Sequence, residues 1–455
     1  LEKLLQTQAS VLVNTHRPAA GRTVHWFGED RDWLSALSDH ITAGRSAYIA
    51  VTSQKSTSVY AASNLATYVA ETLKVPADQI LVVDSSTTRT TGHEARGVIT
   101  NPARLLRYRV VIATPCIETG VSIEDPKQHF DAVFAYATGC TSPQATVQAI
   151  GRVRSDAPRY VCASRNGRTL FGGGIDSDDV LRLNRRAAAL VRDSLFRAGI
   201  AEADEPLSTD HVTAWAGLVA DYNLLTAQFA FSVRTLLATE GYAVRDSLAA
   251  DPDVAATQKD LLREAGAANT AQQCQSVASS IPADQDALEE LERRPELTLR
   301  QQQELEHGQV CRDFGIEQAD DRLVLAHRQR ALTIFRCELL LEEMKANGGR
   351  SDSLHALDSL TAMKRRNILQ RSFIGDFNRA WTLPRIQLLH ELGVLDLVHR
   401  RDEFTMADPE LLAIHNLAKQ HRDRCRTALG IDPCTVRTST FLRDLAERLG
   451  YKLEK

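Results

Sequence analysis

Signals for secretion, membrane insertion and structural metal binding are scarce in this sequence. No apolar run is long enough to span a membrane, and no basic, apolar leader opens the chain. The eight cysteines are spread along the sequence without a Cys-x-x-Cys pair, which argues against a zinc ribbon and a disulfide framework. We therefore expect a soluble, cytoplasmic protein with reduced thiols and no membrane partner.

The motifs that hold a nucleotide and its magnesium ion in P-loop enzymes are also absent. Gly-x-x-x-x-Gly-Lys-Ser/Thr does not occur, and no Asp-Glu pair follows a predicted strand. We therefore do not expect this chain to hydrolyse ATP by itself. It begins at Leu1 rather than at a methionine, and we expect it to be a fragment of a longer protein.

Basic residues exceed acidic residues in the first part of the chain. Residues 1–170 hold 18 Lys and Arg against 14 Asp and Glu, whereas the whole chain has a net charge of −4. Residues 251–320 hold 15 acidic against 6 basic residues. A polyanion such as DNA is therefore expected along the first part, and residues 251–320 are expected to be solvated or to face another partner.

Strand-like and helix-like patterns alternate over the first 170 residues. This alternation predicts an α/β fold with a parallel sheet flanked by helices. Beyond Gly174 the pattern is nearly all helical, and the 455 residues allow about three domains. With linkers at the triple glycine before residue 175 and at residues 346–353, we expect domains at 1–171, 175–346 and 352–455. The predicted strands are residues 11–13, 23–27, 47–51, 80–83, 110–114, 130–135 and 160–163.

Hydroxyl side chains follow three of the predicted strands. Because the carboxyl ends of parallel strands lie at one edge of a sheet, these groups are expected to meet there and to bind the phosphates of a nucleic-acid strand. Thr and Ser are also ordinary helix caps, so capping is the competing interpretation for each loop. The candidate nucleic-acid contacts are Thr52, Ser53, Lys55, Ser85, Thr114 and Thr119.

A second group of candidates lies on the helix predicted at residues 142–153. Gln148, Gly151, Arg152 and Arg154 fall within two helical turns. Glycine permits close backbone approach, and guanidiniums bind phosphate oxygens in a forked geometry, as an arginine finger requires. The competing interpretation is a solvated helix end whose arginines pair with Asp156 or with glutamates.

These segments, in this order and spacing, resemble motif V (residues 114–122) and motif VI (residues 148–154) of superfamily 2 helicases. The form Gln-x-x-Gly-Arg-x-Arg is most similar to replication-initiator helicases of the herpesvirus origin-binding type and of bacteria, phages and plasmids. The resemblance covers roughly the first 170 residues. It implies that this chain is the second RecA-like domain, and that a missing N-terminal RecA-like domain holds most of the ATP and Mg²⁺.

The resemblance also implies roles for individual residues. Gln148, Arg152 and Arg154 would stabilise the transferring phosphoryl group, while Glu118, Gly120 and Gly151 would lie against the nucleotide. Most family members carry the last arginine one position later, where this chain has Ser155, so the finger is either Arg152 or Arg154. We expect both arginines to be exposed and to face the sheet edge that carries Thr114.

The function that follows is an ATP-dependent DNA helicase or translocase acting in replication initiation. Its expected partners are single-stranded or duplex DNA, the N-terminal RecA-like domain, and replication proteins or further copies of itself. A non-catalytic RecA-like scaffold that binds nucleic acid and a translocase subunit of a nuclease system are the alternatives.

Basic clusters in the C-terminal module allow two interpretations. They suit a winged-helix-like DNA reader or, more simply, a charged helical face. The clusters are residues 364–366, residues 400–401, and Arg422, Arg424 and Arg426.

Overall fold

The computed structural model describes residues 15–54, 56–116, 121–197, 209–329, 331–357, 382–399, 405 and 408–448. These residues form two compact units that interleave in sequence. The sheet unit comprises the described parts of 12–168 and 225–329, and the helical unit comprises those of 169–224 and 330–455. The division into three domains made from the sequence stays a prediction.

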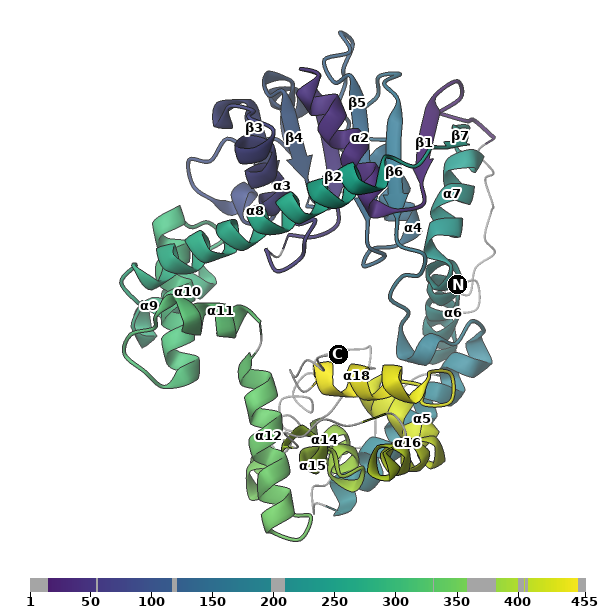
Figure 1. Cartoon of the computed structure of the whole chain (residues 1–455), viewed down its shortest axis with the longest axis vertical. Coiled ribbons are helices and arrows are strands. Elements are labelled where there is room, and N and C mark those ends of the chain that lie inside the picture. Colours follow the sequence, from purple (N-terminus) through teal and green to yellow (C-terminus); the bar gives the residue numbers. More distant parts are fainter. Residues whose placement is uncertain are drawn as a thin grey trace. The chain divides into compact units, whose positions relative to one another are not determined.

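Seven strands form one sheet in the sheet unit, and every pair of neighbouring strands is parallel (Figure 1). The strand order is β3-β4-β2-β5-β6-β1-β7, with β2 between β4 and β5. The predicted parallel α/β sheet is therefore confirmed. The strands are β1 (Thr23–Phe27), β2 (Ala47–Val51), β3 (Ile80–Val83), β4 (Val110–Ala113), β5 (Ala132–Ala137), β6 (Arg159–Ala163) and β7 (Ala243–Asp246).

Six of these strands match predicted strands to within two residues at either end. The predicted strand at 11–13 lies outside the described residues. The seventh strand, β7, was not predicted, because the sequence after Gly174 was expected to be nearly all helical. That expectation is wrong here: β7 is a short edge strand with mostly exposed side chains, so it lacks the apolar run that marks a buried strand.

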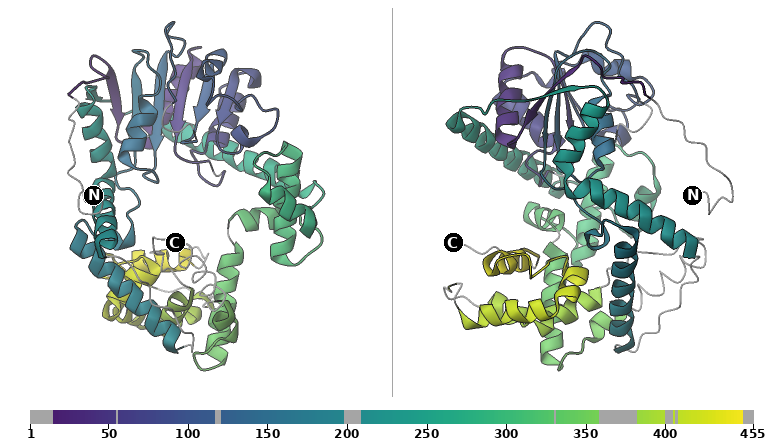
Figure 2. Two further views of the ribbon diagram at one scale, coloured as in Figure 1. Left: turned by 180° about the vertical axis from the view of Figure 1, so that it is seen from behind. Right: turned by 90° about the vertical axis from the view of Figure 1, so that its right-hand side faces the viewer.

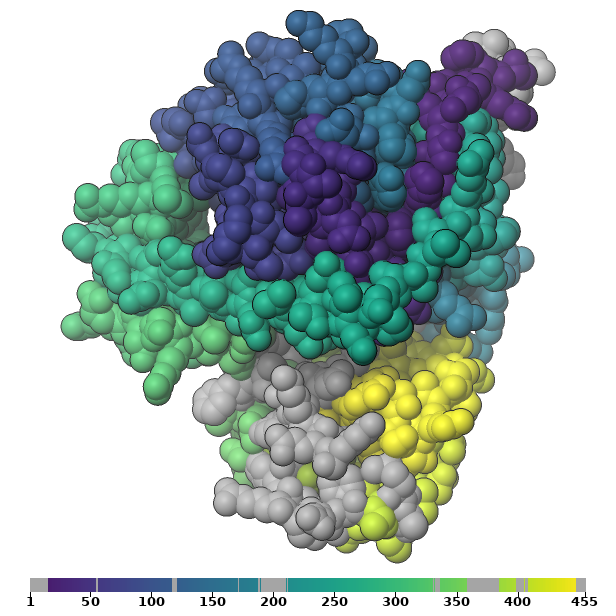
Figure 3. Space-filling view, turned by 45° about the horizontal axis from the view of Figure 1, so that its top comes forward, coloured from purple at the N-terminus to yellow at the C-terminus, as the bar shows by residue number. Residues whose placement is uncertain are grey.

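Helices cover both faces of the sheet, as the two views in Figure 2 show. The helices α2 (Asp30–Thr42), α3 (Ala62–Thr67) and α8 (Pro252–Ala278) bury apolar residues on one face, and α4 (Pro143–Ile150) and α7 (Phe229–Thr239) on the other. In Figure 3, α8 forms a teal band across the purple helices that it contacts. A π-helical turn, η1 (Tyr68–Thr72), continues α3.

Three further helices complete the sheet unit, namely α9 (Gln285–Arg293), α10 (Leu299–Phe314) and α11 (Asp321–Arg328). Helix α10 begins with a capping box, in which Thr298 and Gln301 exchange side-chain to backbone hydrogen bonds. Inside α10, a Cβ on Gly308 would clash with the carbonyl oxygen of Ala283 and would lie 3.0 Å from the nitrogen of Ala283. A side chain therefore cannot be added at this position without moving backbone.

The helical unit confirms the predicted mostly α-helical C-terminal region. Its largest apolar core joins the last helices of the chain, and the helical stretch from residue 409 to 429 is interrupted at His421. In the described parts of the chain, no helix combines the length and apolar character needed to cross a membrane. The helices are α5 (Ser177–Arg197), α6 (Thr209–Ala227), whose end lies in the sheet unit, α12 (Ala331–Ala346), α14 (Thr382–Glu391), α15 (Val394–His399), α16 (Pro409–Gln420), α17 (Arg422–Arg424), η6 (Cys425–Leu429) and α18 (Thr438–Arg448).

We predict that Gly308→Ala destabilises the sheet unit by about 1–3 kcal/mol, the usual cost of forcing extra atoms into a packed contact. The measurement is chemical denaturation followed by circular dichroism. Gly28→Ala is the matched control, because a Cβ at Gly28 would meet nothing within 4 Å. Equal stability of the two variants would contradict the close packing at Gly308.

Candidate functional site

The two segments that resemble helicase motifs lie side by side in the structure. The nitrogen of Ile123 donates to the oxygen of Arg152 (2.9 Å), and the nitrogen of Arg154 donates to the oxygen of Ile123 (3.0 Å). These bonds form an isolated parallel bridge between Ile123 and Val153. The end of the first segment is thus fixed directly against the end of the second.

Side chains reinforce this backbone pairing, but the two arginines differ. Arg152 is buried, with 9% of its surface exposed, and its Nη1 donates to the oxygen of Val121 (2.9 Å). Arg154 is exposed, and its Nε donates to Oγ of Ser122 (3.0 Å). Of the two candidate finger residues, only Arg154 meets the expectation of exposure.

The arginines lie at the edge of the sheet opposite to Thr114. Helix α4 starts after the carboxyl end of β5, where Ser142 caps it, and ends before the amino end of β6. Thr114 follows the carboxyl end of β4. The expectation that both arginines face the edge carrying Thr114 is therefore wrong, because a helix that connects parallel strands returns the chain to the amino edge.

A cavity of about 290 Å³ surrounds the arginines, and we call it the arginine pocket. Its wall holds three guanidinium groups and one carboxylate, that of Glu240. Several guanidiniums around one cavity favour a ligand with several phosphate or carboxylate oxygens. The lining residues are Pro18, Ala19, Arg22, Val121, Ser122, Val147, Gln148, Gly151, Arg152, Arg154, Glu240 and Tyr242.

Arg22 is a member of this pocket that the sequence analysis missed. Its side chain is 14% exposed, its Nε donates to Oδ1 of Asp156 (3.1 Å), and its Nη2 donates to the oxygen of Arg154 (2.5 Å). The competing interpretation paired Asp156 with Arg152 or Arg154, but Asp156 pairs with Arg22 instead. The only sequence signal was an arginine directly before a predicted strand, which marks no function by itself.

Gly151 lines the arginine pocket, although the fold does not require a glycine there. A Cβ at Gly151 would make ordinary contacts, 3.5 Å from the oxygen of Val147 and 3.8 Å from the hydroxyl oxygen of Tyr242. The predicted close approach of a ligand at Gly151 stays a prediction.

The hydroxyl-rich loops converge on the carboxyl edge because all strands are parallel, but their side chains are largely engaged. Thr52 Oγ1 lies 2.9 Å from Oγ1 of Thr138, and Ser85 Oγ donates to Oε1 of Gln54 (2.6 Å). The carbonyl oxygen of Ser53 accepts from the nitrogen of Ala62 (3.0 Å), at the start of α3. None of these bonds is a side-chain helix cap, and Ala61, the N-cap of α3, has no side-chain cap bond, so the capping interpretation of these residues stays a prediction.

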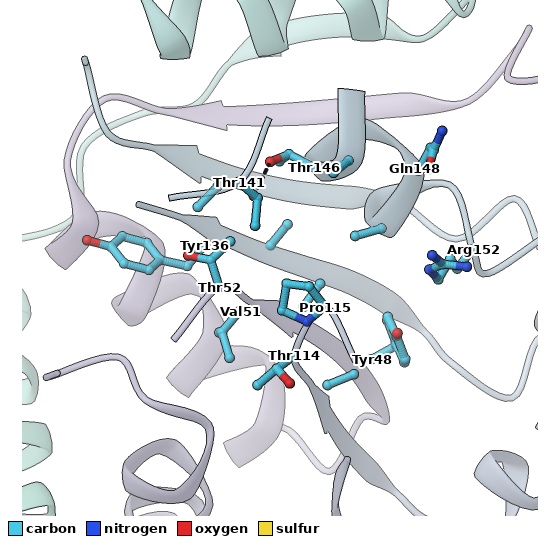
Figure 4. A pocket seen from close by; sticks show the side chains of 16 residues that line it. Tyr48, Val51, Thr52, Thr114, Pro115, Tyr136, Thr141, Thr146, Gln148 and Arg152 are labelled. Carbon is cyan, nitrogen blue, oxygen red and sulfur yellow. Dashed lines mark hydrogen bonds between the residues drawn. The ribbon is translucent and has the colours of Figure 1, made fainter. Parts of the chain in front are cut away.

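Thr114 behaves differently from these loop residues. Its side chain is buried, with 7% exposed, and it lines a second cavity of about 260 Å³ between the sheet and α4 (Figure 4). Gln148 and Arg152 belong to the walls of both cavities. The remaining predicted contacts, Lys55, Glu118, Thr119 and Gly120, lie outside the described residues.

The described basic residues near the C-terminus are paired with acids. Arg422 donates to both carboxylate oxygens of Asp432 (2.9 and 2.7 Å), and Arg424 makes a bidentate pair with Glu391. This pairing favours the charged helical face over a DNA reader for Arg422 and Arg424. The clusters at 364–366 and 400–401 lie outside the described residues.

A fully buried arginine shapes the turn that presents Arg154. Arg159 donates from Nη1 to the oxygen of Ser155 (2.9 Å) and also to Ala157, and from Nη2 to the oxygen of Val153 (2.6 Å). Burial lowers the pKa of Arg159, and its guanidinium lies 5.8 Å from the centre of the Tyr242 ring. The turn is therefore wrapped around one guanidinium, which sets the position of Arg154.

We predict that Arg159→Met destabilises the sheet unit by about 2–4 kcal/mol, because it leaves buried carbonyl oxygens without donors. Arg159→Lys is expected to rescue little of this loss, since an ammonium cannot reproduce the fork. Denaturant unfolding measures both effects. Arg245→Met, at an exposed position on β7, is the control and should change stability by less than about 0.5 kcal/mol. A stable Arg159→Met variant would refute this role.

Comparisons with known proteins place the chain in no family. No family model matches it, and no solved structure matches it. An uncharacterized protein from Picosynechococcus sp. is 26% identical over 318 residues, which cover 67% of this chain. The chain spans only 31% of the length of that protein.

Proposed function

We propose that this chain is the second RecA-like domain and helical C-terminal region of an ATP-dependent DNA helicase or translocase acting in replication initiation. The observation that carries the proposal is the pairing of residues 121–123 with residues 152–154 beside a pocket of three guanidiniums. The two segments carry the resemblance to helicase motifs V and VI. Their contact is what a shared nucleotide site requires.

Within this proposal, Arg154 is the arginine finger. It is exposed in the pocket, whereas the guanidinium of Arg152 is bonded to the oxygen of Val121 and holds the two segments together. Arg22 would be a further phosphate contact, and Gln148 would lie near the γ-phosphate. Positive charge placed where the transferring phosphoryl group gains negative charge lowers the barrier to hydrolysis.

The ATP and its Mg²⁺ would be held mostly by a phosphate-loop domain that this chain does not contain. The arginine pocket suits phosphate oxygens, but the described residues contain no cluster of three or more acidic, His or Cys side chains that would hold a metal ion. The matched Picosynechococcus protein is about three times the length of the matched region, which agrees with a place in a longer chain.

The two sheet edges would then serve different ligands. The arginines act on the triphosphate at the amino edge, and the loops at Thr52, Ser53, Ser85 and Thr114 contact strand phosphates at the carboxyl edge. Thr114 and Ser122, close together in sequence, lie at the two edges, so movement at the nucleotide would be passed to the DNA strand. Replication proteins or further copies of the chain are the other proposed partners, in the cytoplasm.

We predict that Arg154→Ala lowers kcat for DNA-stimulated ATP hydrolysis by about 10³-fold or more, as expected for an arginine finger. The measurement uses the intact protein that joins this chain to its phosphate-loop domain. Arg154→Lys should recover little activity, because one ammonium does not make forked contacts. Arg263→Ala on α8 is the control, since Arg263 pairs with Asp260 outside both cavities and its loss should leave kcat unchanged.

Full turnover in both Arg152→Ala and Arg154→Ala would refute the motor. If those variants still bound single-stranded DNA, the non-catalytic scaffold would replace it. A nuclease domain in the remainder of the intact protein would instead favour the translocase subunit of a nuclease system.

A further inference from the structure

The face of the sheet under α4 is recessed near its carboxyl edge. Each of three neighbouring strands carries a larger residue on this face near its amino end. The next residues of the same strand on this face are alanines. On the opposite face the strands keep large side chains as far as the carboxyl edge, such as Val51, Ile112 and Tyr136. The residues on the recessed face are Tyr48 and Ala50 on β2, Val111 and Ala113 on β4, and Val133, Ala135 and Ala137 on β5.

Strand register places three of these alanines in one row. Ala50 on the middle strand is the partner of Ala113 on β4 and of Ala135 on β5. With neighbouring strands about 4.8 Å apart, the row gives a flat apolar floor roughly 10 Å wide. From α4, Ala145 and Ala149 line the cavity above this floor.

The floor belongs to the cavity of about 260 Å³ that Thr114 lines, which we call the alanine-floored pocket (Figure 4). In most proteins, side chains fill the layer between a parallel sheet and the helices that cover it and leave no cavity of this kind. Here Thr52, Thr114 and Thr141 line the cavity near the carboxyl edge, while Tyr48, Gln148 and Arg152 line it towards the amino edge. The pocket therefore combines a flat apolar surface with several polar groups.

Two hydroxyl side chains that line this pocket make no hydrogen bond to the described residues. The hydroxyl of Tyr48, a residue only 1% exposed, and the hydroxyl of Thr114 have none within the described part of the chain. Burial also raises the pKa of Tyr48, so this hydroxyl keeps its proton and can donate. Neither oxygen is among the fully buried atoms without a partner, so both hydroxyls open into the cavity, where a ligand can offer them donors and acceptors.

The chemistry of the walls narrows the class of ligand. Among the described residues no carboxylate lines the pocket, which disfavours a cation, and the one charged lining residue among them is Arg152, whose Nη1 is bonded to Val121. A flat group with an apolar face and mixed donors and acceptors on its edge fits the remaining features. Nucleobases have this combination of properties.

We propose that the alanine-floored pocket binds one nucleobase, with its face on the row Ala113, Ala50 and Ala135 and its edge bonded to Tyr48 and Thr114. The base comes either from a DNA strand at the carboxyl edge or from a free nucleoside. Only the first source rests on the proposed function. The chain would then bind a base through this pocket in addition to binding phosphates.

The test uses the full 455-residue chain and two fluorescent probes, 2-aminopurine riboside and an oligothymidylate that carries one 2-aminopurine. Bound 2-aminopurine is expected to be shielded from quenching by acrylamide. Ala50→Val, which places methyl groups at the centre of the floor, should abolish the shielding. Tyr48→Phe should weaken probe binding by about two- to tenfold, the effect of one neutral hydrogen bond.

Ala238→Val, at an exposed position near the end of α7, is the matched control and should bind both probes normally. Shielding of the oligonucleotide alone identifies a strand base, and shielding of the riboside identifies a nucleoside. An unshielded base in both probes, or shielding that survives Ala50→Val, would overturn the proposal. If Ala50→Val fails to fold, unchanged affinity in Tyr48→Phe would overturn it.

The proposed function has a separate readout in the same experiment. Oligonucleotide binding measured by anisotropy, with an unshielded base, would contradict the base pocket alone. Absence of oligonucleotide binding together with a shielded riboside would contradict the DNA-binding role and leave the base pocket standing.

Discussion

The backbone bridge between Ile123 and Val153 is the contact on which the candidate site depends. It joins two loops that leave different strands of the sheet, and it places Arg152, Arg154 and Ser122 around one cavity. An isolated bridge has only two hydrogen bonds, so side chains must support it. Arg152 supports the bridge by donating to the oxygen of Val121, and Arg159 supports it by donating to the oxygen of Val153.

This arrangement assigns different work to three arginines that are close in sequence. Arg152 and Arg159 are buried and bonded to carbonyl oxygens, whereas Arg154 is exposed and its Nε donates to Oγ of Ser122. Guanidinium groups suit both tasks, because their planar fork can satisfy several acceptors at once. Motif spacing alone cannot tell an arginine that holds the backbone from one that binds a ligand, because both are arginines within one short segment.

The parallel sheet was predictable because its strands are apolar runs separated by helical patterns. Segments 47–51 and 80–83 match β2 and β3 residue for residue. Strand β7 was missed because pairing with β1, rather than its own composition, makes it a strand. The site was only half predictable. Motif spacing indicated Gln148, Gly151 and the two arginines, but Arg22 and the row of alanines depend on strand register and on contacts between distant segments.

The unequal packing of the two sheet faces has a consequence for the response of the fold to hydrostatic pressure. One face is filled with aromatic and branched residues, among them Trp33 and Phe134, whereas the other leaves a partly open cavity above Ala50. Unfolding eliminates internal voids and so reduces the volume of the system. Compression should therefore loosen the alanine side of the sheet first, and a ligand that occupies the cavity would make the protein harder to compress.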